Sequence, residues 1–173
     1  MTLNDGFMNK MLECLAWSEI SRDFTFDEQL LAKFQENVDW PNISANSYIR
    51  WASTMLEEFK NRIDWDILSS SYPCRREYCV FSISNLEKYK EYWNWTNLSK
   101  NRYIEFSIEK IERLAQEWDW DILIDNSEFK EMLDIDILFK YKQYISAPKF
   151  WDSLVGLKTK QIIEEKLTYK SNE

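Results

Sequence analysis

Apolar residues recur along this chain in a pattern that is repeated four times. The four copies are 17-residue segments that align without gaps: 24–40, 49–65, 79–95 and 104–120. Every copy is apolar at positions 3, 8, 11 and 15, which in the first copy are Phe26, Leu31, Phe34 and Val38. At about 100° per residue these positions form one broad stripe, with Glu, Lys and Arg between them. The pattern predicts an amphipathic helix across each segment.

A second motif begins around the tryptophan that ends each segment. In the first copy it reads Asp-Trp-x-x-Ile-Ser-x-Asn and covers residues 39–46. Trp40 and Ile43 put two apolar groups three residues apart, which suits one short helical turn pressed onto a core. Asp39 is placed as the N-cap of that turn, and Asn46 is expected to end it in left-handed backbone. One repeat is therefore predicted to be a long helix followed by a short one.

The spacing of the motif indicates a repeat array. Tryptophans at 17, 40, 65, 95 and 120 are separated by 23, 25, 30 and 25 residues, with the copy at Trp17 the weakest. Self-similarity at such a period, about 25 residues, is typical of units that bury their apolar faces only against their neighbours. Two glycines and three prolines are few for a sheet protein with many tight turns.

The predicted architecture is a single all-α domain over residues 1–173, a short solenoid-like array of helix plus short-helix repeats. Residues 1–23 form an N-terminal cap with a degenerate repeat, 24–126 form four repeats, and 127–173 form a helical C-terminal cap. We expect the repeated tryptophans to lie in the core, with Trp51 and Trp151 as the candidates for exposure.

The longest spacing, from Trp65 to Trp95, contains five extra residues, which we place in a loop within 69–78. Loops on rigid scaffolds often carry recognition, and Tyr and Arg are enriched in interface hot spots. The candidate binding residues of this inserted loop are Tyr72, Arg75, Arg76 and Tyr78. The alternative is a variable connection without a function.

Charge separates the ends of the chain. The formal net charge is -8, which argues against direct binding to nucleic acid, because Lys and Arg supply that affinity. Acidic residues crowd between 117 and 136, where Lys130 is the single base. The candidate partner-binding acids are Glu117, Asp121, Asp125, Glu128, Glu131, Asp134 and Asp136. Focused negative potential steers a basic partner and mimics phosphate, whereas the alternative is a solvated surface.

No residue pattern predicts catalysis, a metal site or a cofactor. Cys14, Cys74 and Cys79 lack CxxC spacing, and the sequence has no histidine. The acidic pairs 119/121 and 134/136 lack the companions of a known site, and Asp119 falls in the N-cap column. With no membrane-span pattern and no signal-peptide pattern, we expect a soluble, cytoplasmic protein.

At these motifs the sequence resembles a tryptophan-rich repeat, roughly Asp-Trp-x-x-Leu-Ser-x-Asn followed by an amphipathic helix. That repeat recurs in predicted proteins of bacteria and large DNA viruses. The resemblance covers about residues 15–126, with Ile124 in place of the Ser and Ser71 in place of the last Asn. It implies an interaction scaffold and suggests a virus or mobile-element origin, with no established activity to carry over.

The sequence therefore favours a non-catalytic protein-binding module over an enzyme. Its sharpest form is a small acidic inhibitor of a nucleic-acid-binding protein or nuclease, like phage anti-defence proteins such as anti-CRISPRs, acting in the host cytoplasm. The alternative is a passive helical-repeat adaptor, and a carboxylate-dependent enzyme is a distant third. The expected partner is a protein with a basic or nucleic-acid-binding surface. Nothing in the sequence decides the oligomeric state.

Overall fold

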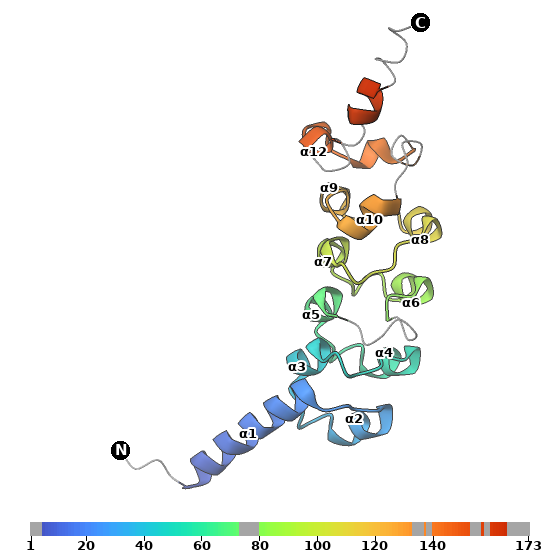
Figure 1. The fold of residues 1–173 in the computed structure, drawn as a ribbon. Coiled ribbons are helices and arrows are strands. Elements are labelled where there is room, and N and C mark those ends of the chain that lie inside the picture. The colour runs from blue at the N-terminus through green and yellow to red at the C-terminus, as the bar shows by residue number, and fades with distance from the viewer. Residues whose placement is uncertain are drawn as a thin grey trace, which may run out of the picture. The chain divides into compact units, whose positions relative to one another are not determined.

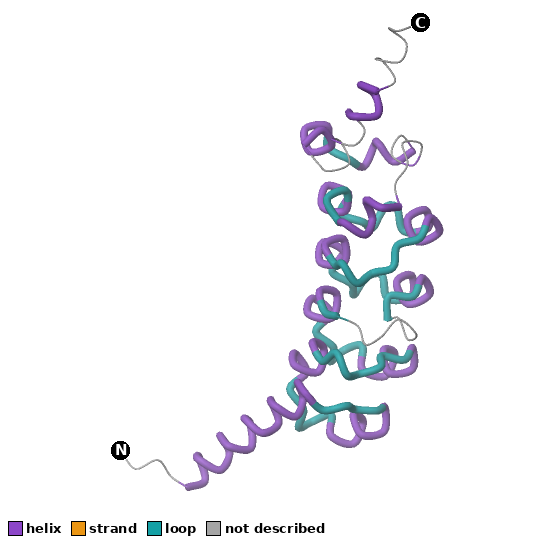
Figure 2. Tube along the Cα trace, in the orientation of Figure 1, coloured by secondary structure: helices purple, strands orange, loops and turns teal. Residues whose placement is uncertain are grey.

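The computed structural model describes residues 5–72, 80–132, 137, 140–152, 157 and 160–165. In these residues every regular element is a helix, so the predicted all-α class is confirmed. The chain divides into two compact units, Met1–Trp93 and Asn94–Glu173. Within each unit, short helices stack as a solenoid-like array (Figure 1, Figure 2).

The helices of each unit alternate between two rows. In the first unit they are α1 (Asp5–Asp23), α2 (Glu28–Phe34), α3 (Trp40–Ala45), α4 (Ser53–Phe59), α5 (Trp65–Ser70) and α6 (Ile83–Lys88). In the second they are α7 (Trp95–Lys100), α8 (Ile108–Arg113), α9 (Trp120–Leu123), α10 (Ser127–Met132), the 3-10 turn η2 (Lys142–Tyr144) and α12 (Ala147–Asp152). The helices that begin at the motif tryptophan pack on one another in succession, α3 on α5 and α7 on α9.

The helices that carry the apolar stripe are shorter than the periodicity predicts. In the first copy α2 has seven residues and α3 has six, so the repeat is a pair of short helices. In this copy the helix begins after a capping residue at position 4, where Asp27 accepts a hydrogen bond from the Leu30 amide at 2.8 Å. Buried Phe26 therefore lies outside the helix. In the second copy α4 begins at the same position after Ala52, without a side-chain cap. The apolar stripe therefore runs across an irregular segment and a helix. Its periodicity alone predicts a helix that is longer than the one observed.

The predicted N-caps of the short helices are confirmed in three copies. The side chains of Asp39, Asp64 and Asn94 each accept a hydrogen bond from the amide three residues on, at 3.3, 3.0 and 3.0 Å. Asp119 holds the N-cap position of α9, but its side chain makes no capping bond. Its carboxylate accepts a hydrogen bond from the Thr96 hydroxyl at 3.1 Å instead.

The left-handed backbone predicted for the closing asparagine is wrong. Asn46 has φ -71° and ψ 110°, and Asn101 has φ -69° and ψ 120°, which is extended backbone. Both residues are buried. Asparagine is needed here for its side-chain amide, because the hydrogen bonds of the Asn46 amide hold neighbouring copies together.

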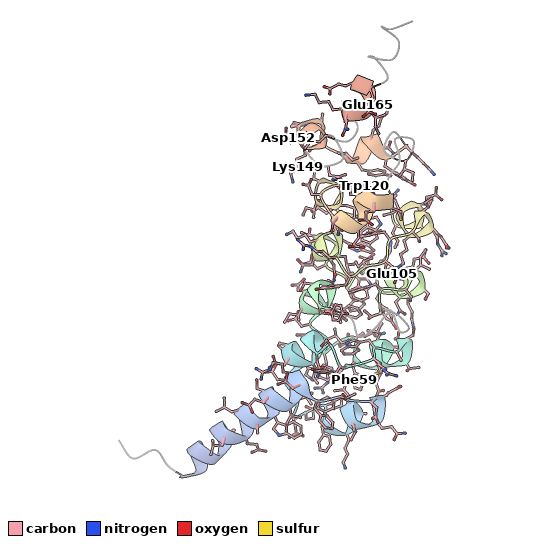
Figure 3. All side chains as sticks on the ribbon, in the orientation of Figure 1. Phe59, Glu105, Trp120, Lys149, Asp152 and Glu165 are labelled. Carbon is pink, nitrogen blue, oxygen red and sulfur yellow. The ribbon has the colours of Figure 1, made fainter. Side chains whose placement is uncertain are left out.

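The motif tryptophans join consecutive copies. The rings of Trp17, Trp40 and Trp65 lie 5.4, 5.4 and 5.6 Å from the position-11 rings of the following copies, which are Phe34, Phe59 and Tyr89. The indole N–H groups of Trp40, Trp65 and Trp120 donate to backbone carbonyl groups five residues earlier. Figure 3 shows Phe59 and Trp120 inside their stacks, where they are 1% and 3% exposed. Trp51 is also buried, at 5% exposed.

The stacking geometry continues into residues 140–152, where the motif is no longer visible in the sequence. Trp120 stacks on Tyr141 at 4.8 Å, and in the first unit Trp65 lies 5.6 Å from Tyr89 with the rings tilted. Lys140 pairs with Glu112, as Lys88 pairs with Glu57. Helix α12 has Pro148 as its second residue, as α3 has Pro41. The described part of this C-terminal segment is thus a further, degenerate copy.

Candidate functional site

The motif serine is a junction between neighbouring copies. The Ser44 hydroxyl accepts a hydrogen bond from the Asp64 amide at 2.9 Å and donates one to the Trp40 carbonyl at 2.8 Å. Ser21 and Ser99 accept from the amides of Asp39 and Asp119, at 2.9 and 3.0 Å. All three serines are at most 1% exposed. Ser21, near the weak copy at Trp17, thus makes the same kind of contact to the following copy as Ser44 and Ser99 do.

The motif asparagine clamps the preceding copy. The Asn46 side-chain amide donates to the carbonyl groups of Ser21 and Phe24, both at 2.8 Å, and its oxygen accepts from the Tyr48 amide at 2.8 Å. Asn126 repeats this arrangement with Ser99, Asn101 and Glu128. These buried polar groups satisfy backbone groups that would otherwise be orphaned. The polar part of the motif serves the fold and is not a ligand site.

Asp121 is a structural residue and not a free acid. Its carboxylate accepts hydrogen bonds from both the amide and the hydroxyl of Ser146, each at 2.9 Å. Its carbonyl oxygen accepts from Lys149 at 3.4 Å. Residue 124, where the motif serine would stand, is a buried isoleucine, so Asp121 supplies the acceptor that the missing hydroxyl cannot. The sequence analysis placed Asp121 among the partner-binding acids and did not assign it this role.

Three other predicted acids form what we call the acidic corner: Asp125, Glu128 and Glu131. All three are exposed, and Glu128 and Glu131 are three residues apart in α10, on one face of that helix. Among the described residues, no ion pair involves these three carboxylates. Glu117 differs from these three acids, because it is half-buried and interacts with another group. Asp134 and Asp136 lie outside the described residues.

Two cations of the second unit, Lys140 and Arg113, pair with acids outside the acidic corner. Lys140 contacts Glu112 at 2.6 Å, and the hydrogen bond that Lys140 donates to this carboxylate raises the pKa of Lys140. Arg113 pairs with Glu109 at 3.1 Å. Because Lys140 and Arg113 pair with other acids, these two cations do not neutralise the negative potential of the acidic corner.

The inserted loop is described only at its start. Tyr72 is 53% exposed and belongs to no helix. Arg75, Arg76 and Tyr78 lie outside the described residues, as do Cys74 and Cys79. The binding site predicted for this loop therefore stays a prediction.

Among the residues that the structure describes, Glu57 in α4 has the pKa that departs furthest from its ordinary value. Its carboxylate contacts Lys60 at 2.5 Å and Lys88 at 3.0 Å, and it accepts from the Tyr89 hydroxyl at 3.1 Å. These hydrogen bonds, that from Lys60 first, lower the pKa of Glu57 to about 2. Lys60 and Lys88 have raised pKa values in turn, Lys60 through Glu57 and Lys88 through Tyr89 and then Glu57. A carboxyl group that stays ionised cannot serve as a general acid near neutral pH, and this cluster joins α4 to α6.

Two other kinds of site are absent from the part of the chain that the structure covers. There, no three Cys, Asp or Glu side chains gather in a way that would hold a metal ion. None of the covered helices combines the length and apolar composition that a membrane span needs. Cys14 is free and exposed on α1.

The fold defines an all-α repeat protein, in which each copy is a pair of short helices with a tryptophan, a serine and an asparagine at the junctions. No family model, curated protein or solved structure matches this chain.

Proposed function

We propose that this chain is a non-catalytic protein-binding module whose acidic corner binds a basic surface of another protein. The observation that carries the proposal is that Asp125, Glu128 and Glu131 are exposed and outside every described ion pair, although Asp119 and Asp121 close by are held in junctions. Because no ion pair among the described residues holds these three carboxylates, they are available to a basic partner.

Electrostatics support a basic partner. The formal net charge of -8 disfavours nucleic acid itself, whose binding depends on Lys and Arg. Exposed carboxylates attract Lys and Arg over about one Debye length and raise the rate of encounter. The sharpest form of the proposal is an inhibitor that occupies the phosphate-binding surface of a nucleic-acid-binding protein.

The test is affinity capture from a lysate of the organism that carries this chain, with and without nuclease. Three baits are compared: the unchanged protein, Asp125→Lys/Glu128→Lys/Glu131→Lys, and a control, Glu13→Lys/Glu19→Lys/Glu58→Lys. The control carries the same charge change at exposed acids of the first unit. We expect basic proteins on the unchanged and control baits in both conditions, and at least about a tenfold loss on the corner variant.

Equal capture by all three baits at moderate salt would overturn the role of the acidic corner. A passive adaptor that binds through the inserted loop is favoured by one observation, the exposure of Tyr72. It predicts that Tyr72→Ala loses the captured proteins while the corner variant retains them. A thermal melt with Mg²⁺ or EDTA tests the enzyme alternative, because a carboxylate metal site would raise the midpoint by mass action.

A further inference from the structure

We draw no further inference here: the strongest candidate, the apolar surface of helix α1 around Leu12, Leu15 and Ile20, which are 59, 58 and 41% exposed, carries none because nothing in the structure shows what covers it.

Discussion

Two junctions of the array supply a hydrogen-bond acceptor to a backbone amide, one from a hydroxyl group and the other from a carboxylate. In the first unit, the amide of Asp64 donates to the buried hydroxyl of Ser44. At the end of the array in the second unit, Ile124 occupies the serine position, and the amide of Ser146 donates to the carboxylate of Asp121. The comparison shows that each copy needs an acceptor for the amide that precedes its short helix, and that the residue supplying it is exchangeable.

The two solutions differ in burial and charge. Ser44 is 1% exposed, so water cannot replace its hydroxyl, whereas Asp121 is half-buried and within reach of solvent. A buried donor that loses its partner keeps the full desolvation penalty, while a donor near the surface finds water. Equivalent changes at the two junctions should therefore have unequal costs.

The largest effect is expected from Ser44→Ala. Removal of the hydroxyl leaves the Asp64 amide unsatisfied inside the stack and should lower the free energy of unfolding by about 1–3 kcal/mol. Urea unfolding followed by tryptophan fluorescence measures it. Ser70→Ala is the control, since Ser70 is exposed and bonds only to carbonyl groups within its own helix α5. Equal effects of the two substitutions would contradict the junction role of Ser44.

Tryptophan variants test whether buried hydrogen bonds other than those of the motif serine also stabilise the fold. Trp65→Phe removes the bond from the indole to the Lys60 carbonyl at 2.8 Å and should cost about 1–2 kcal/mol. Trp51 is a matched contrast, because its buried indole N–H is the orphan among the described side chains and other copies have Phe at that position. Trp51→Phe should leave the urea midpoint unchanged or raise it. A loss as large as that of Trp65→Phe would show that ring volume, and not the hydrogen bond, dominates.

Asp121→Ala should lower the free energy of unfolding by about 1 kcal/mol, which is less than for Ser44→Ala, because the Ser146 amide can form a hydrogen bond with water instead. A double-mutant cycle with Ile124→Ser sharpens the comparison. The new hydroxyl would recreate the first kind of junction, so Asp121→Ala should cost less in that background, by up to about 1 kcal/mol of coupling. Both pairs of variants are compared by urea unfolding. Strict additivity would mean that residue 124 does not stand in the acceptor position.

The smallest effect is a pH dependence of the first unit. In the folded protein the pKa of Glu57 is lowered from its ordinary value of about 4.5 to about 2. A lowered carboxyl pKa contributes stability that is present above pH 4.5 and is lost as the pH falls toward 2. We expect the urea midpoint of Glu57→Gln to fall less steeply than that of the unchanged protein over this window.

Glu58→Gln serves as the control for that titration, since Glu58 is the exposed neighbour of Glu57 in α4. Parallel pH curves for Glu57→Gln and the unchanged protein would show that the pairing with Lys60 and Lys88 persists in the unfolded chain or contributes nothing.

The repeats and their caps are the parts of the fold that follow from local pattern. Tryptophans at a regular spacing predict the array, and the acidic or amide residue before each one predicts the N-caps at Asp39, Asp64 and Asn94. These features need only a few neighbouring residues, so the sequence states them directly. Helix length does not follow, because Asp27, Ser82 and Ser107 interrupt a stripe that remains apolar on both sides of the cap.

For the candidate site, the sequence predicted an acidic region but not which acids are available to a partner. Asp125, Glu128 and Glu131 remain exposed, whereas Asp121 is taken up by a junction. One signal was present: Ile124 breaks the serine column, which implies that some other group must accept the next amide. That inference requires the serine contact to be known first.

By itself the sequence determined an all-helical array, its period and the positions of its tryptophans, because apolar spacing and caps act within a few residues. The tertiary structure alone decided the roles of Ser44, Asn46 and Asp121, whose hydrogen bonds reach 20 to 25 residues along the chain. Such bonds form only when neighbouring copies stack and exclude water, so their partners are set by packing and not by local sequence.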